Sequence, residues 1–154
     1  MLGDDELKEI MAEIERFEDQ RGACVEALKI VQRHRGFVSD EALRDIAPVL
    51  GMTMDELDGI ATFYSFIFRK PVGRHMILVC DSVSCWVMGY EEILAHLKER
   101  LGIGLGETTS DGRFTLLPVS CIGSCHNAPA FMVDGMLYGD LDSRKVDEIL
   151  AGYP

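Results

Sequence analysis

The residues best suited to chemistry in this 154-residue chain are its five cysteines: Cys24, Cys80, Cys85, Cys121 and Cys125. Four of them form two pairs, with four residues between Cys80 and Cys85 and three between Cys121 and Cys125. Cysteine sulfurs bind zinc and iron–sulfur clusters, and they also act as redox couples or nucleophiles. Cys24 stands alone near the apolar face of a predicted helix, so we expect it to be a small packing residue.

A predicted strand precedes each cysteine pair. The run HMILVC (75–80) is typical of a buried strand that ends at Cys80, and FTLLPVS (114–120) is typical of a strand that ends just before Cys121. In each pair the second cysteine is expected in the loop after the strand. If the two strands are neighbours in one sheet, both loops meet at the same edge and the four sulfurs converge.

The spacing of these sulfurs favours an iron–sulfur cluster. Zinc sites built only from cysteine usually have two-residue spacers, whereas spacers of four and three residues suit a larger group with two irons and two thiolates on each. A zinc-stabilised interaction module is the first alternative. A thiol–disulfide oxidoreductase is the second, although its typical two-residue spacer is absent. A cysteine nucleophile would leave one pair unexplained.

Small and polar residues surround both pairs, and such loops let backbone N–H groups reach cluster sulfurs, which raises a reduction potential. Gly123 supplies either a positive φ for its turn or plain loop structure. Trp86 is expected to pack as an ordinary aromatic residue rather than to serve redox chemistry. His126 is expected to face solvent rather than to act as a ligand.

Residues 1–70 are predicted to form a bundle of four short helices. Apolar residues recur at helical spacing from Leu7 to Phe17, and a second helix ends at Gly36. Ser39 and Thr53 are predicted to cap the third and fourth helices. A following aromatic run is expected in the bundle core or between domains rather than on a docking surface: Phe63, Tyr64, Phe66 and Phe68.

Residues 71–154 are predicted to form a second, α/β domain. An amphipathic helix covers 90–101, a hairpin with an Asp-Gly turn covers 130–138, and Ser143 is expected to cap a last helix. The order β-α-β-β-β-α suggests a compact sheet flanked by helices, like a reduced thioredoxin fold. The predicted fold class is therefore α+β, with an N-terminal helical bundle followed by a thioredoxin-like domain.

Composition narrows the possible partners. The formal net charge of −11 argues against nucleic acid and against an anionic membrane surface. No stretch approaches the ~20 apolar residues of a membrane span. The acidic start MLGDDELKEI resembles neither a secretory signal nor a transit peptide, so we expect the chain in a reducing cytosol.

The two cysteine motifs, CDSVSC and CIGSC, resemble those of the thioredoxin-like [2Fe–2S] subunit of respiratory complex I, the 24 kDa subunit family. Longer stretches also read like that family: ALKIVQRHRGFVSDEAL, GIATFYSFIFRKPVGRH and SDGRFTLLPVSCIGSC. The resemblance covers nearly the whole chain, and its motifs are specific.

This resemblance implies that Cys80, Cys85, Cys121 and Cys125 ligate one [2Fe–2S] cluster per chain. It also implies partners: a flavin- and NADH-binding subunit whose FMN lies near the cluster, and further subunits of the peripheral arm. The chain would be an electron-carrying subunit of NADH:quinone oxidoreductase (NADH dehydrogenase), catalytically incomplete alone. It would be a bacterial form on the cytoplasmic side of a membrane-bound complex, not itself inserted in the membrane. NAD-linked hydrogenases and formate dehydrogenases have related subunits and remain alternatives.

Overall fold

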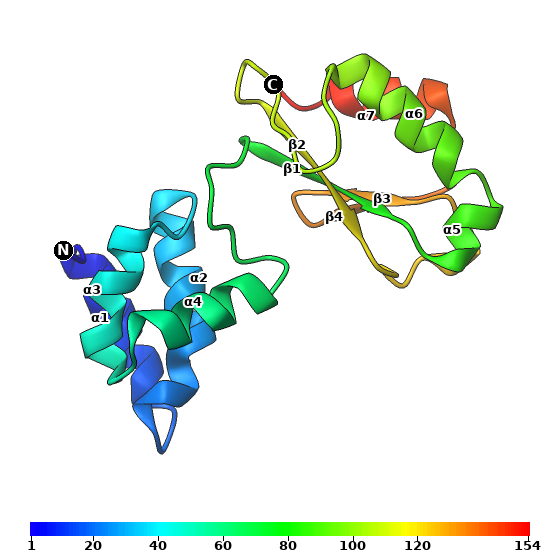
Figure 1. Cartoon of the computed structure of the whole chain (residues 1–154). Coiled ribbons are helices and arrows are strands. Elements are labelled where there is room, and N and C mark those ends of the chain that lie inside the picture. Colours follow the sequence, from blue (N-terminus) through cyan, green and yellow to red (C-terminus); the bar gives the residue numbers. More distant parts are fainter. The chain divides into compact units, whose positions relative to one another are not determined.

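The computed structural model describes all residues from Met1 to Pro154. The chain forms two compact units, Met1–Pro71 and Val72–Pro154, each with its own hydrophobic core (Figure 1). The first unit is helical and the second is built on a four-stranded sheet, which confirms the predicted α+β class. No helix combines the length and the apolar composition needed to cross a membrane.

Local signals set the helix ends of the first unit. The Ser39 hydroxyl accepts a 3.1 Å hydrogen bond from the backbone N–H of Ala42, and Thr53 forms a capping box with Glu56. Gly36 ends the second helix in a left-handed conformation, as predicted. The helices are α1 (Asp4–Ile14), α2 (Cys24–Arg35, preceded by a 3-10 turn η1 at Gln20–Ala23), α3 (Asp40–Leu50) and α4 (Met54–Phe63).

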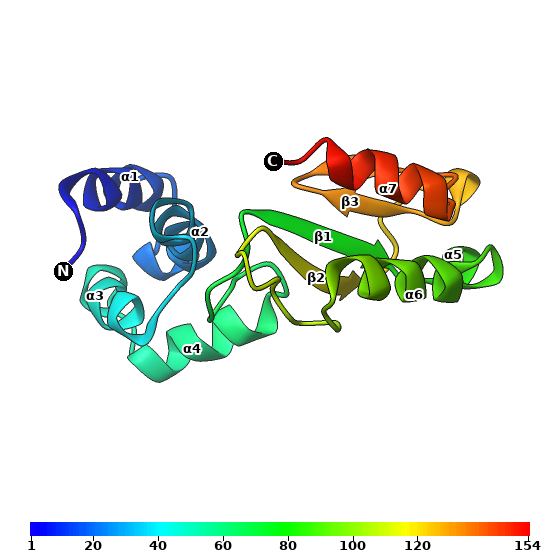
Figure 2. The same ribbon diagram turned by 90° about the horizontal axis from the view of Figure 1, so that it is seen from above.

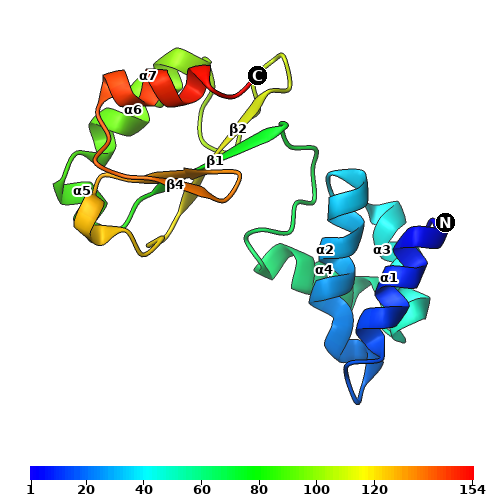
Figure 3. The same cartoon turned by 180° about the vertical axis from the view of Figure 1, so that it is seen from behind.

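Helix α1 packs alongside α2 (Figure 3), but its apolar stripe is narrower than predicted. Ile10 is fully buried, whereas Leu7 and Met11 are partly exposed. The buried face also includes Glu6, which accepts two 2.6 Å hydrogen bonds from the Arg35 guanidinium of α2. The face of α1 that packs against α2 therefore contains a bidentate ion pair, whereas the hydrophobic periodicity predicted only apolar residues there.

The aromatic run that begins at the last residue of α4 does not lie in the bundle core. Phe63 is 80% exposed, and Tyr64 and Phe66 are also exposed. Helix α4 ends at Phe63, so the helical spacing that suggested a buried stripe does not continue through the run. Ile67 is the residue of this segment that joins the core.

The second unit contains a sheet in the order β2-β1-β3-β4, in which β1 pairs parallel with β2 and antiparallel with β3. Asp134 and Gly135 form the predicted β3–β4 turn, both with positive φ. The elements are β1 (His75–Cys80), α5 (Val83–Val87), α6 (Tyr90–Leu101), β2 (Phe114–Val119), β3 (Phe131–Val133), β4 (Met136–Tyr138) and α7 (Ser143–Ala151).

Helices α6 and α7 lie side by side on one face of this sheet (Figures 1 and 2). Ile77 and Val79 of β1 are buried, as alternate residues of a strand with one covered face should be. The cap of α7 is Asp142 rather than the predicted Ser143, because the Asp142 carboxylate accepts the backbone N–H of Lys145 at 2.7 Å. An aspartate and a serine are both good caps, so their order along the chain did not decide between them.

The other sheet face is apolar and carries no helix of its own unit. Leu78 pairs with Leu117 on one side and with Met132 on the other, and Met132 pairs with Leu137. These side chains form a row across all four strands, and each keeps some exposure to solvent.

Candidate metal centre

Two parallel strand ends bring the cysteine pairs to one edge of the sheet. Strands β1 and β2 are neighbours in register, with Cys80 opposite Val119, and the backbone N–H of Asp81 donates to the carbonyl of Val119 at 3.0 Å. Cys80 is the last residue of β1, and Cys121 lies two residues beyond the end of β2. The strands are therefore adjacent, as the convergence of the two pairs requires.

Cys85 lies in the short helix α5 rather than in the predicted loop. The backbone N–H of Trp86 donates to the carbonyl of Ser82 at 2.9 Å and closes the first turn of this helix. Cys125 similarly begins a 3-10 turn, η2 (Cys125–Asn127). Single helical turns are too short for hydrophobic periodicity to reveal them.

Cys121 and Cys125 form a close pair, with 3.4 Å between their Sγ atoms. Between them, Gly123 has a φ of +81°, so of the two roles considered for this glycine it has the one that needs a positive φ. This turn aims the backbone N–H of Gly123 at the Cys121 Sγ, 3.4 Å away. The hydrogen bond lowers the pKa of the Cys121 thiol, because it stabilises the thiolate.

Cys80 and Cys85 form the inner pair and are each only 2% exposed. Burial, together with the neighbouring Cys80 thiol, raises the pKa of the Cys85 thiol to about 11. The backbone N–H of Ala130 opposes this effect by hydrogen bonding to Cys85. The two pairs thus differ, since the inner thiols are shielded and the outer thiols are exposed.

Helix α5 links the two pairs. Cys125 lines a shallow hollow together with Val83, Ser84, Val87 and Met88 of α5 and its C-terminal end. The pKa of Cys125 is raised, mainly because the Cys121 thiol shares a hydrogen bond with it, while the Ser84 hydroxyl lowers it by hydrogen bonding to the sulfur.

The donor set suits a group that spans two sulfur pairs. No three Cys, His, Asp or Glu side chains converge as the ligands of a single metal ion would. A [2Fe–2S] cluster needs two thiolates on each of two irons, which matches one inner and one outer pair. The loop also holds the Ser124 hydroxyl, buried and without any hydrogen-bond partner in the chain. An unsatisfied buried hydroxyl costs about 1–3 kcal/mol, and a sulfur-containing group held at this loop would offer it an acceptor.

Other residues considered from the sequence lie outside the sulfur set. Cys24 is half-buried and packs against the helical core of the first unit, as expected for a packing residue. Trp86 is exposed and stacks on Tyr90, with 5.9 Å between the ring centroids. His126 faces solvent, as predicted.

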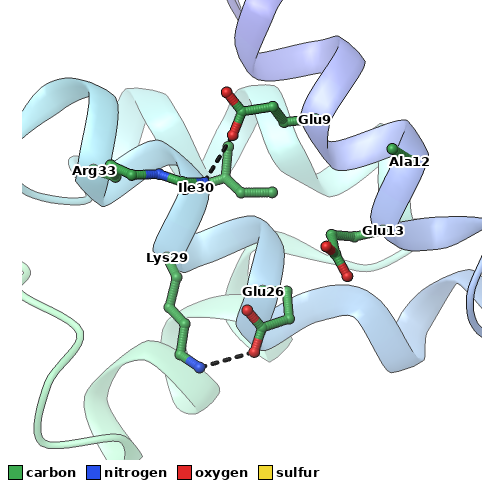
Figure 4. Close-up of a pocket in the computed structure, with 7 residues that line it drawn as sticks. All are labelled: Glu9, Ala12, Glu13, Glu26, Lys29, Ile30 and Arg33. Atoms are coloured by element: carbon green, nitrogen blue, oxygen red, sulfur yellow. Dashed lines mark hydrogen bonds and ion pairs between the residues drawn. The ribbon is translucent and has the colours of Figure 1, made fainter.

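The helical unit contains a different hollow between α1 and α2, lined mainly by charged side chains (Figure 4). Arg33 pairs with Glu9 at 2.7 Å and Lys29 with Glu26 at 2.8 Å. Glu13 is paired with Arg16 at 3.0 Å. Because these charges neutralise one another, the hollow offers no free group for a ligand.

Comparison with protein-family models identifies the family of this chain. The family model described as thioredoxin-like [2Fe-2S] ferredoxin matches residues 8–154. The chain belongs to the thioredoxin-like [2Fe–2S] ferredoxin family. Membership gives it the cofactor of that family, a [2Fe–2S] cluster, and confirms the resemblance seen in the cysteine motifs.

Two curated relatives cover almost the whole chain, and both are named as the same subunit of NADH-quinone oxidoreductase. The relative from Pseudomonas aeruginosa is 50% identical over 99% of this chain and 92% of its own length. The relative from Escherichia coli is 49% identical over 96% of this chain and 89% of its own length.

A solved structure contains a region similar in fold to this chain. The crystal structure of NAD+-reducing [NiFe]-hydrogenase in the air-oxidized state matches 84% of the chain with a TM-score of 0.73 and 26% identity. The matched region is only 22% of that hydrogenase chain. The hydrogenase chain therefore contains a region of this fold within a longer polypeptide.

Proposed function

We propose that the chain is the [2Fe–2S] electron-transfer subunit of a bacterial NADH:quinone oxidoreductase, respiratory complex I. One pair of cysteines would ligate each iron: Cys80 with Cys85, and Cys121 with Cys125. The observation that carries this proposal is the meeting of two sulfur pairs at one sheet edge, in a chain half identical to the P. aeruginosa oxidoreductase subunit over nearly its full length.

A bound [2Fe–2S] cluster accepts and returns one electron at a time. The residues around the four cysteines would determine the charge stabilisation and the solvent access of the cluster. The backbone N–H of Gly123 donates toward the Cys121 sulfur and stabilises negative charge there. The buried Cys80 and Cys85 keep water from the inner side of the site. The exposed Cys121 and Cys125 leave the outer side open to a redox partner.

The proposed partner is the flavin- and NADH-binding subunit, which would carry FMN and receive hydride from NADH. Exposed apolar side chains beside Cys125 support a protein partner here, because they are costly to leave in water: Val83, Val87 and Met88. Docking at this edge would place the flavin near the exposed sulfurs. Further peripheral-arm subunits would hold the pair on the cytoplasmic side of the membrane complex.

An NAD-linked hydrogenase is the second host to consider, since the matched crystal structure is an NAD+-reducing enzyme. The identity to that structure is 26%, against 50% to the oxidoreductase subunit of P. aeruginosa. The comparison therefore favours complex I.

Metal content and spectroscopy test the cofactor. Protein purified without oxygen should be red-brown and contain two irons per chain, and dithionite should yield the EPR signal of one unpaired spin. Colourless protein with one zinc per chain would overturn the proposal in favour of an interaction module.

A charged substitution tests the docking edge. Val87→Asp should weaken co-purification with the flavin subunit and slow cluster reduction by NADH, while the dithionite-reduced EPR signal persists. Met136→Asp is the matched control, because Met136 is also exposed but lies beside the β3–β4 turn, near the opposite end of β1. Equal behaviour of the two variants would exclude α5 as the docking edge.

A further inference from the structure

We propose that the Ser124 hydroxyl donates a hydrogen bond to a sulfur of the bound cluster and raises its reduction potential. This inference rests on the proposed function, because it needs a [2Fe–2S] cluster at the four cysteines. It concerns a side chain that is not a ligand and whose role the cysteine motif does not predict.

The Ser124 hydroxyl is the one buried side-chain polar atom for which the chain offers no electrostatic explanation. The residue is 3% exposed, and its Oγ has no hydrogen-bond partner. Two other buried atoms also lack hydrogen bonds. However, Asp45 Oδ2 pairs with the N-terminal amine at 2.8 Å, and the Arg113 guanidinium lies over the Phe114 ring. Buried hydroxyls are normally paired, so Ser124 calls for an acceptor.

Ser124 lies next to a proposed cluster ligand along the chain, which makes a cluster sulfur the acceptor that we propose. It lies directly before Cys125, in the loop that begins at Cys121, and is the only buried residue of that five-residue stretch. Its carbonyl already accepts the backbone N–H of Asn127 at 3.0 Å, whereas the hydroxyl has no partner. The group that this loop would hold carries sulfur atoms, and sulfur accepts hydrogen bonds from hydroxyl groups.

Charge determines the direction of the effect. One-electron reduction makes the cluster more negative, so a donated hydrogen bond stabilises the reduced form more than the oxidised form. Removing the donor should therefore lower the reduction potential. The net charge of −11 also lowers the reduction potential, because surrounding negative charge disfavours the addition of an electron. The Ser124 hydroxyl would partly offset that charge.

An EPR-monitored redox titration of the full chain with dithionite tests the inference. Ser124→Ala should lower the ratio of reduced to oxidised cluster about tenfold at a fixed solution potential, which for one electron corresponds to about 59 mV. Ser124→Thr keeps a hydroxyl and should titrate close to the wild type. Ser120→Ala is the matched control, because Ser120 is a serine beside the same loop that is exposed to solvent.

The outcomes separate this inference from the proposed function. An unchanged potential in Ser124→Ala with intact cluster, or equal shifts in Ser124→Ala and Ser120→Ala, would overturn the role of Ser124 while leaving the cluster in place. If Ser124→Ala does not retain iron, Ser124→Gly, which also lacks the hydroxyl, decides: a lowered potential supports the hydroxyl donor, and a wild-type potential overturns it. Wild-type protein without iron would instead refute the proposed function.

Discussion

The Sγ atoms of Cys121 and Cys125 lie 3.4 Å apart at the protein surface, whereas Cys80 and Cys85 are buried beside them. The proposed cluster site is therefore asymmetric, with one protected pair and one accessible pair. This arrangement suits the proposed electron carrier, because the inner pair would shield the cluster while the outer pair would face the proposed partner.

This asymmetry predicts the order in which the thiols react. In cluster-free protein, iodoacetamide should modify Cys121 and Cys125 well before Cys80 and Cys85, since alkylation needs an accessible thiolate. Mass spectrometry of peptides after short exposure measures this order. Uniform labelling of all four thiols would contradict the burial pattern. In cluster-loaded protein the outer pair should be protected as well.

Removal of single sulfurs tests the ligand set. Cys85→Ala and Cys121→Ala should each lose most of the bound iron, because three thiolates cannot complete two irons. Cys24→Ala is the control and should keep its iron, since Cys24 packs in the helical unit. Iron loss in Cys24→Ala comparable to that in Cys85→Ala would show that the ligand assignment is wrong.

The turn at Gly123 should be required for stable iron binding. Its φ of +81° is unfavourable for an L residue by about 1–2 kcal/mol, although an added Cβ would meet no atom within 4 Å. Gly123→Ala should therefore lose iron to a chelator faster than the wild type. Gly112→Ala shares the strain, with a φ of +66° and open space, but lies in the turn before β2. Equal rates of iron loss in the two variants would mean that the Gly123 turn has no special role.

The buried ion pair of the helical unit predicts a stability effect. Arg35→Met would leave Glu6 buried without its guanidinium, whose hydrogen bonds hold the pKa of that carboxyl below its usual range. We expect a loss of about 1–3 kcal/mol in the free energy of unfolding. Arg33→Met removes an exposed pair with Glu9 and should cost less than about 1 kcal/mol. Urea unfolding followed by circular dichroism measures both, and similar losses would contradict a special role for the buried pair.

Acid should weaken the helical unit through Glu56. The backbone N–H of Thr53, then Arg21 and the Thr53 hydroxyl, lower the pKa of this carboxyl to about 2. A carboxyl whose pKa is lowered on folding contributes stability above its unfolded pKa of 4.5, and that contribution disappears as the pH falls toward 2. Glu56→Gln lacks this titration and should lose less stability over the same interval. Melting temperatures that fall in parallel from pH 4.5 to 2 would rule out this contribution.

The sequence by itself determined the features that depend on near neighbours. The caps at Ser39 and Thr53, the glycine end at Gly36 and the Asp134–Gly135 turn follow from interactions within a few residues. Cysteine spacing indicated a group larger than one metal ion for the same reason, because the spacers limit how the sulfurs of each pair can be placed.

Only the tertiary structure decided which side chains are buried and what they meet. The folded chain places Cys85 on a helical turn, exposes Phe63, and buries Glu6 against Arg35. It also encloses the Ser124 hydroxyl without a partner. Burial and pairing depend on segments far apart along the chain, and local periodicity carries no information about them. The four proposed ligand residues could be named from the sequence, whereas the asymmetry of the site arises from the way the sheet edge folds around them.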